Sequence, residues 1–304
     1  MQKAITSSIV ICTRNRPNDL RICLDSIATQ TMMPQELIVV DSSDIPLSEQ
    51  RGFTEYFSSA RFPSIALIYT HTKPGLTHQR NVGIMRATGD VLYFFDDDVK
   101  LENSYLDQMS TIFTQHQHYG GGMGAIINVP PRASYWQRVL RTVFLLQQDY
   151  SSGRFTWSGM PTHAYGRISF QDVEVLGGCC MAYRREFIIK HRFDERLTRY
   201  AFMEDCDASR RVSLDAPLFY NPYAKLQHFN SPLARDRVID NRAMYIKNYS
   251  YLFFKNFYPH QKLRIIGYVW SIVGLFVEAL LFRRVDYIRG YMTGLRSYFY
   301  EQSA

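Results

Sequence analysis

Four short apolar runs, rich in β-branched or aromatic residues, divide the first hundred residues of the chain. They lie at residues 8–12, 37–40, 65–69 and 91–95. Residues 17–30 repeat apolar positions at helical spacing, residues 77–87 form a second helical segment, and a short helix is expected between the second and third runs. This alternation predicts an α/β fold with a Rossmann-like, mostly parallel sheet flanked by helices.

Polar residues follow each apolar run directly. The four sets are Thr13-Arg14-Asn15-Arg16, Asp41-Ser42-Ser43, His71-Thr72-Lys73 and Asp96-Asp97-Asp98. In open α/β sheets, ligands bind beyond the carboxyl ends of the strands. The sequence therefore predicts that the functional site lies among these residues.

The three successive acids are the sharpest chemical signal. Asp96, Asp97 and Asp98 come directly after an apolar strand, so two of the carboxylates can face one point. Hard oxygen ligands suit Mg²⁺ or Mn²⁺, which would keep open positions for phosphate oxygens. The alternative is an acidic helix N-cap with solvated neighbours. Mutual repulsion of three acids beside a buried strand favours the metal site.

Basic residues gather at the same strand ends. They are Arg14, Arg16, Lys73 and Arg80. Each could be a solvated surface charge, which is the usual place of a single arginine. Their clustering favours contact of at least one of them with a diphosphate or a nucleobase.

Three features of the second half are candidates for chemistry, and each has a purely structural alternative. The apolar segment 173–183 is interrupted by Gly177 and Gly178, which allow either close approach of a sugar or a simple bulge or turn. Glu204 and Asp205 begin a predicted helix, where acids also suit the helix dipole. His228 follows a strand-like stretch and is either a structural histidine or a ligand.

As an ordered set, these motifs resemble glycosyltransferase family 2. The matching segments are residues 9–16, 37–43, 79–83, 87–90 and 95–98. The resemblance implies the A-type nucleotide-diphospho-sugar transferase fold, and it makes the acidic triplet the DxD motif of the family. It also implies inversion at the anomeric carbon.

The resemblance carries roles over to individual residues. The implied donor-nucleotide residues are Thr13, Arg14, Arg16, Asp41, Ser43, Arg80, Asp96 and Asp97, and the implied metal ligands are Asp98, Asp96 and His228. The glycine pair, Gly177 and Gly178, is similar to the segment on the acceptor side. Asp205 is the implied general base, with Glu204 as the other candidate. One base suffices, because a divalent metal can stabilise the nucleoside diphosphate leaving group without protonation.

The C-terminal part has a different character. Residues 265–282 form an apolar run with one acid, Glu278, and arginines at both ends. As a helix it would be about 27 Å long, which is marginal for crossing a bilayer. Gly267, Ser271 and Gly274 form a small, polar stripe that suits packing against another helix. We expect an interfacial or re-entrant helix, and the alternative is a buried helix of a soluble domain.

Charge and cysteine content refine this division. Residues 235–304 carry 11 Lys and Arg against 5 Asp and Glu, so this tail holds six of the seven net positive charges. We expect a catalytic domain at 1–234, with a nucleotide-sugar half at 1–100 and an acceptor half at 101–234, and a helical membrane-associating tail at 235–304. No long apolar stretch precedes the first strand, and five cysteines without a CxxC pair indicate reduced thiols. Both point to a cytoplasmic protein, peripheral or monotopic at the inner face of the membrane.

The leading hypothesis is a hexosyl- or deoxyhexosyltransferase. It would move a sugar from a nucleotide-diphospho-sugar donor to a hydroxyl of a glycan or lipid-linked glycan, as in cell-surface polysaccharide synthesis. A nucleotidyltransferase acting on sugar phosphates is an alternative, but no glycine-rich loop follows the first strand. A nonenzymatic membrane or nucleic-acid adaptor is another. Acids in its cleft would repel nucleic-acid phosphates, so no nucleic-acid partner is expected.

Overall fold

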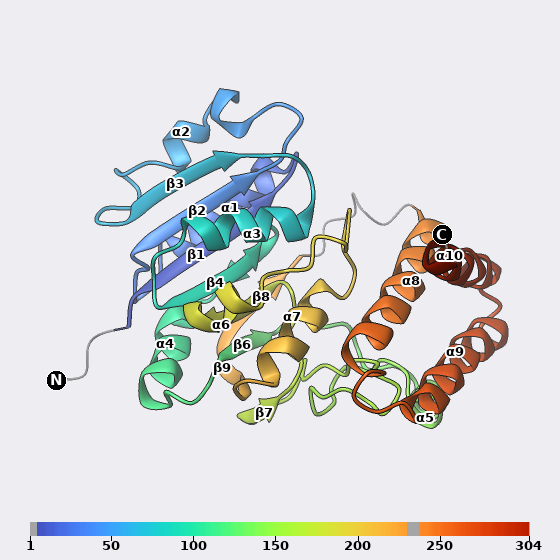
Figure 1. The fold of residues 1–304 in the computed structure, drawn as a ribbon. Coiled ribbons are helices and arrows are strands. Elements are labelled where there is room, and N and C mark those ends of the chain that lie inside the picture. The colour runs from blue at the N-terminus through green and yellow to red at the C-terminus, as the bar shows by residue number, and fades with distance from the viewer. Residues whose placement is uncertain (1–4, 230–236, 304) are drawn as a thin grey trace. The chain divides into compact units, whose positions relative to one another are not determined.

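The computed structural model describes residues 5–229 and 237–303, and the chain packs into two units (Figure 1). The sheet unit comprises Met1–Val129, Tyr165–Arg199 and Glu204–Asn230, and the helical unit comprises Pro130–Ala164, Tyr200–Met203 and Ser231–Ala304. The expected boundary at 234/235 lies outside the described residues. Residues 130–164, expected in the acceptor half, group instead with the C-terminal helices.

The sheet unit is built on one mixed sheet. Its strands are β1 (Ser7–Thr13), β2 (Glu36–Asp41), β3 (Ala66–His71), β4 (Val91–Asp96), β5 (Val99–Leu101), β6 (Gly121–Ile126), β7 (Gln171–Val173), β8 (Cys180–Arg184) and β9 (Leu218–His228). Their order is β3-β2-β1-β4-β8-β6-β9-β5, and β7 also pairs with β9. The first four strands are parallel, as predicted, whereas β8 is antiparallel to both its neighbours. Strands β6 and β9 are also parallel, whereas β5 and β7 are antiparallel to β9. The expected parallel arrangement therefore holds for the first four strands, and the second half of the sheet is mixed, because apolar runs do not encode strand direction.

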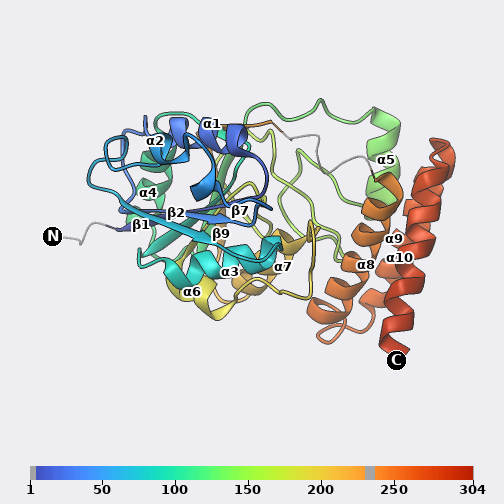
Figure 2. The same ribbon diagram turned by 90° about the horizontal axis from the view of Figure 1, so that it is seen from above.

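Helices cover both faces of this sheet. They are α1 (Pro17–Ile27), α2 (Phe53–Tyr56), α3 (Leu76–Arg86), α4 (Tyr105–Gln115), α6 (Arg185–Lys190) and α7 (Glu204–Ser213), with a 3-10 turn at Leu47–Glu49. Figure 2 shows α1, α2 and α4 on one face and α3, α6 and α7 on the other. The predicted apolar stripe of α1 is buried, and each such side chain stabilises the fold by about 1.5–3 kcal/mol.

The helical unit consists of α5 (Tyr135–Val143), α8 (Val238–Asn256), α9 (Arg264–Leu281) and α10 (Val285–Ser303). Helices α8 and α10 pack closely. The absence of a side chain at Gly294 allows this, since a Cβ there would lie 2.2 Å from the carbonyl oxygen of Ala243. The small stripe of α9 also packs inside this unit. A Cβ at Gly274 would meet Phe144 at 2.3 Å, and the hydroxyls of Ser271 and Tyr249 lie 2.7 Å apart.

The other face of α9 is apolar and exposed. It carries Ile266, Val269, Trp270, Val273, Leu280 and Leu281, each at least 43% exposed. Among the described residues, α9 is the one helix long and apolar enough to cross a membrane, judged by length and composition.

A buried carboxylate ties the ends of three elements together. Glu36, at the start of β2, accepts hydrogen bonds from the Ser8 hydroxyl, from the Thr88 amide at 2.8 Å and from the Thr88 hydroxyl at 2.6 Å. Burial alone would raise the pKa of Glu36, but these hydrogen bonds outweigh burial and lower it. Glu36 therefore stabilises the fold in its ionised form.

We expect Glu36→Gln to lower the free energy of unfolding at neutral pH by about 1–3 kcal/mol, because it removes charge-assisted hydrogen bonds. The folded-state pKa lies below the unfolded value, so this stabilisation is present above the unfolded pKa and is lost as the pH falls through the folded pKa. Denaturant titrations at several pH values should show the two proteins converging in acid. Glu55→Gln, on exposed α2, is the matched control and should change little at any pH. A difference that does not depend on pH would contradict this account.

Candidate active site

The acidic triplet lies where several strands end. In the register of the sheet, Cys12 pairs with Asp96, and Thr13 pairs with Asp41. The polar residues after β1, β2 and β4 therefore meet at one edge of the sheet. These are the residues among which the sequence predicted the functional site, and that site stays a prediction.

Asp96, Asp98 and His228 form a candidate metal site. Each offers one ligand atom, and the three atoms lie within 4.8 Å of one another. His228 lies beside the two acids because β9 pairs with β5, and this pairing places His228 opposite Val99. Two carboxylates and an imidazole at this spacing suit a divalent cation such as Mg²⁺ or Mn²⁺, which leaves further positions for phosphate oxygens.

His228 and Asp98 interact directly. The His228 Nε2 atom lies 3.1 Å from Asp98 Oδ1. Burial alone would lower the pKa of His228, but hydrogen bonding with Asp98 and Cys179 outweighs burial and raises the pKa to about 11. At neutral pH an imidazolium thus faces the carboxylate, and a bound cation would take the place of its proton. Cys179 is a neighbour of this site that the sequence did not single out.

Asp97 lies in a different environment from the acids beside it. Its Oδ2 accepts a hydrogen bond from the Thr13 hydroxyl at 2.7 Å, and its Oδ1 lies 3.1 Å from Arg16 Nη1. Burial raises the pKa of Asp97 to about 7, although Thr13 and Arg16 both act to lower it. Asp97 therefore holds the loop after β1 in place. Direct contact of Asp97, Thr13 or Arg16 with a nucleotide stays a prediction.

Arg14 lies in the loop after β1 and Ser43 in the loop after β2, and polar contacts join the two loops. The Arg14 guanidinium pairs with Asp44 at 3.1 Å on the exposed surface. The Ser43 hydroxyl accepts a hydrogen bond from the Asn15 amide at 2.8 Å. Asn15 has a φ of 57°, a left-handed conformation that asparagine tolerates better than most residues. Both residues lie at the predicted edge, and their roles in donor binding stay predictions.

Asp41 is fully buried and anchors the loop after β2. One of its carboxylate oxygens accepts from the Ser43 amide at 2.8 Å, and the other accepts from the Leu47 amide at 2.8 Å and the Tyr69 hydroxyl at 2.7 Å. Tyr69 was missed by the sequence analysis, which placed it only as a strand residue. The predicted contact of Asp41 with a nucleobase stays a prediction.

Arg80 lies in the interior of the site. Its side chain is 3% exposed, and its guanidinium bonds to Glu204, to Asp96 at 3.2 Å and to the Gly178 carbonyl oxygen at 2.9 Å. Burial raises the pKa of Glu204 well above its ordinary value, although Arg80 acts to lower it. Protein groups surround the guanidinium, and its predicted contact with the nucleotide stays a prediction.

Asp205 differs from Glu204 in access. Glu204 is buried, whereas Asp205 is only half-buried. One carboxylate oxygen of Asp205 accepts a hydrogen bond from the Gly178 amide at 2.8 Å. A Cβ at Gly177 would lie 2.1 Å from the Tyr165 hydroxyl, whereas a Cβ at Gly178 would lie 3.1 Å from the Glu204 carboxylate. The predicted acceptor-side and acid residues thus lie together.

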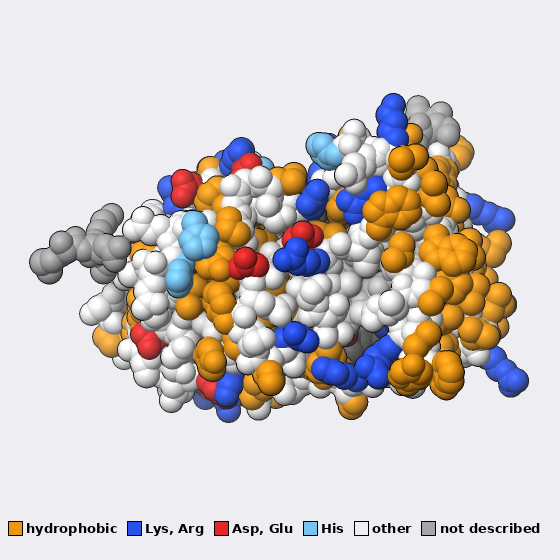
Figure 3. Space-filling model, turned by 90° about the horizontal axis from the view of Figure 1, so that it is seen from below, with side chains coloured by type: hydrophobic (Ala, Val, Ile, Leu, Met, Phe, Trp, Pro, Cys, Tyr) orange, Lys and Arg blue, Asp and Glu red, His pale blue; other side chains and the backbone are white. Residues whose placement is uncertain are grey.

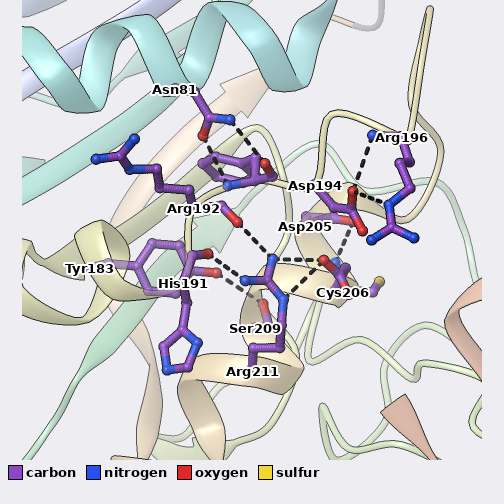
Figure 4. A network of polar contacts seen from close by, with 12 residues as sticks. Asn81, Tyr183, His191, Arg192, Asp194, Arg196, Asp205, Cys206, Ser209 and Arg211 are labelled. Carbon is purple, nitrogen blue, oxygen red and sulfur yellow. Dashed lines mark hydrogen bonds and ion pairs between the residues drawn. The ribbon is translucent and has the colours of Figure 1, made fainter. Parts of the chain in front are cut away.

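A polar network holds the helix that carries these acids (Figure 4). The hydroxyls of Tyr183 and Ser209 lie 3.0 Å apart. Arg211 donates to the carbonyl oxygens of His191 and Arg192 at 2.7 and 2.9 Å, and it pairs with Asp207 at 2.7 Å. These contacts fix α7 against β8 and the loop after α6, and so they fix where Glu204 and Asp205 lie.

Solved structures share this fold. The crystal structure of GalNAc-T7 with UDP, GalNAc and Mn²⁺ matches 84% of this chain and 48% of that chain, with a TM-score of 0.60 and 15% identity. The structure of S. aureus TarS matches 97% of this chain and 55% of that chain, with a TM-score of 0.56 and 16% identity. At these identities the likeness concerns the fold alone, and it confirms the expected A-type glycosyltransferase fold.

Sequence relatives carry the comparison further. The glycosyltransferase YwdF of Bacillus subtilis is 33% identical over 167 residues, which cover 54% of this chain and 59% of that protein. A glycosyltransferase of Haemophilus influenzae is 35% identical over 91 residues, which cover 30% of this chain and 29% of that protein. The chain thus spans less than two thirds of either relative. The model of the family named glycosyl transferase family 2 matches residues 8–192, which is more than half of the chain. The chain therefore belongs to glycosyltransferase family 2.

Proposed function

We propose that this chain transfers a sugar from a nucleotide-diphospho-sugar donor to a hydroxyl of a glycan or lipid-linked glycan, with inversion of the anomeric carbon. The observation that carries the proposal is the set of three ligand atoms from Asp96, Asp98 and His228 within 4.8 Å of one another. These three residues lie at the edge of the sheet where β1 and β2 also end. The structure of GalNAc-T7, which shares the fold, contains UDP and Mn²⁺, and this supports a similar use of the site here.

Each group would have a distinct task in the reaction. A divalent cation held by Asp96, Asp98 and His228 would neutralise the diphosphate leaving group. The acceptor oxygen would attack the anomeric carbon while the bond to the β-phosphate oxygen breaks, and the electron pair of that bond would leave with the nucleoside diphosphate. Asp205 would accept the proton of the acceptor hydroxyl. Glu204 suits this task less well, because it is buried and bound to Arg80.

The helical unit supports a location at the membrane. The exposed face of α9 is apolar along its length, and the chain carries its excess positive charge in the same region. Such a helix can lie in the interface of a bilayer with its apolar face toward the acyl chains. We propose peripheral or monotopic attachment at the cytoplasmic face, where a lipid-linked acceptor would be within reach. A nucleotidyltransferase or an adaptor would leave the family motifs without a role.

Metal-dependent donor binding is the first consequence to test. We expect a nucleoside diphosphate with Mn²⁺ to stabilise the protein by roughly 2.7 kcal/mol at a hundredfold excess over its dissociation constant, and neither component alone to do so. A thermal-shift screen of the diphosphates UDP, dTDP and GDP and of the monophosphate CMP, each with and without Mn²⁺, measures this. Asp98→Ala should abolish the combined shift, whereas Asp107→Ala, which removes an exposed acid on α4, should keep it. A full metal-dependent shift in Asp98→Ala would refute the metal site.

The base can be assigned by comparing two isosteric variants. We expect Asp205→Asn to keep the nucleotide-induced shift while the rate of transfer falls about 10²–10⁴-fold, because only proton acceptance is lost. Glu204→Gln should retain more transfer, since Glu204 has a structural role beside Arg80. Radiolabelled sugar transfer to total membrane glycolipid would measure both rates. Normal transfer by Asp205→Asn would remove it from the base role.

The buried pair of Arg80 and Glu204 has a separate consequence for stability. Arg80→Met leaves the Glu204 carboxylate buried without its partner, so we expect a loss of about 3–5 kcal/mol in the free energy of unfolding. Adding Glu204→Gln should restore part of that loss, because the uncompensated charge is removed. Urea denaturation of the two single variants and the double variant measures the coupling. Strictly additive losses would show that the two groups act independently.

A further inference from the structure

The helical unit contains a polar cavity whose lining residues lie outside the candidate active site. Its volume is about 210 Å³, and it is lined by side chains of α5, the loop after α5, α8, α9, α10 and the turn between α9 and α10. The charged groups around it are Arg141, Arg242, Arg284, Glu278 and Asp149. A polar cavity of this size has room for several waters or for one phosphate group with its substituent.

Two of the arginines converge on one neutral oxygen. Arg242 Nη2 and Arg284 Nη1 donate to the Tyr287 hydroxyl at 2.8 and 2.6 Å. Both guanidinium groups also pack on the Tyr287 ring, at 3.9 and 4.9 Å from its centroid. Within residues 5–229 and 237–303, no ion pair joins either of them to a carboxylate. Two like charges are therefore held side by side, an arrangement that an anion between them would stabilise.

The other charges of the cavity do not cancel this pair. Glu278 is already engaged, because its Oε1 accepts from Arg141 Nε at 2.7 Å and from Gln137 at 3.0 Å. Asp149 and Arg284 are both exposed, so solvent screens both charges, and three arginines stand against two acids. The cavity thus keeps a net positive charge, and its forked donors match the geometry of phosphate oxygens.

The surroundings of the pair indicate where the phosphate comes from. Arg284 follows the exposed apolar residues Leu280, Leu281 and Phe282, and Phe282 itself lines the cavity. On α5, which supplies Arg141 to the cavity, Trp136 is 77% exposed. Figure 3 shows hydrophobic side chains gathered over the part of the surface that carries α5 and α9, with Lys and Arg at its border. Phosphates of a bilayer lie at this kind of border between apolar and basic groups.

We propose that Arg242 and Arg284 form a binding site for the phosphate group of an anionic membrane lipid, at the edge of the apolar face of α9. The site would fix how the helical unit lies on the membrane, in addition to the general attraction of a basic surface. The inference rests on the proposed membrane contact, but not on the chemistry of sugar transfer.

Vesicle binding with matched charge variants tests the site. The full chain would be sedimented with phosphatidylcholine vesicles that contain or lack phosphatidylglycerol. We expect Arg242→Gln/Arg284→Gln to weaken binding to the anionic vesicles by roughly tenfold more than Arg289→Gln/Arg296→Gln, which removes the same charge from α10 outside the cavity. Arg284→Gln alone, at the exposed turn, serves as a second variant if the double variant unfolds. Circular dichroism would verify folding in each case.

The outcomes separate the site from the membrane contact on which it rests. Equal losses in the two double variants would overturn the phosphate site and leave only non-specific attraction. Failure of the unchanged protein to bind any vesicle would overturn the membrane contact as well, whereas donor-induced thermal shifts would be unaffected. Saturation of the arginine pair by inorganic phosphate, with no preference for anionic vesicles, would show that the source is a free anion and would overturn the lipid assignment.

Discussion

A single buried guanidinium holds the two halves of the sheet unit together. Arg80 comes from α3, which packs on β1 and β2, and it bonds to Asp96 at the end of β4, to Glu204 at the start of α7 and to the Gly178 carbonyl oxygen. Buried charges need partners, so these contacts couple the placement of α3, the end of β4 and the start of α7. The position of Asp205, next to Glu204, follows from the same contact.

Three identical neighbours in the sequence enter two different arrangements. Successive residues at a strand end point in different directions, and so Asp96, Asp97 and Asp98 enter different environments. Asp97 turns toward Thr13 and Arg16 and holds a loop, whereas Asp96 and Asp98 face His228. Arg16 and Arg80 offset part of the negative charge, and the remainder is available to a cation. The mutual repulsion of Asp96 and Asp98 is the reason that they form a candidate ligand site for a cation.

The local pattern of apolar and polar residues sets how much of the fold and of the candidate site could be predicted from the sequence. The first four strands, the helix after β1 and the polar residues at each strand end follow from the periodicity of apolar residues and from turn-forming residues between them. Both signals act over a few residues. Motif order then brought Glu204, Asp205 and His228 into the same hypothesis. Tyr69 contacts Asp41 and Tyr165 contacts Gly177 through packing across the fold. The residues next to these tyrosines in the chain do not indicate such contacts. The reversal of β8 and the grouping of residues 130–164 with the C-terminal helices are likewise set by distant partners.

The short strand β5 pairs with β9, and through this pairing Asp98 meets His228. Since β9 is the last strand of the sheet, the chain must be synthesised almost through the whole sheet unit before β5 has a partner. Contacts between residues so distant in the chain form late and slowly in folding. During synthesis the three acids would therefore stand at an unfinished edge, and a nascent chain would complete the candidate cation site only as folding of the sheet is completed.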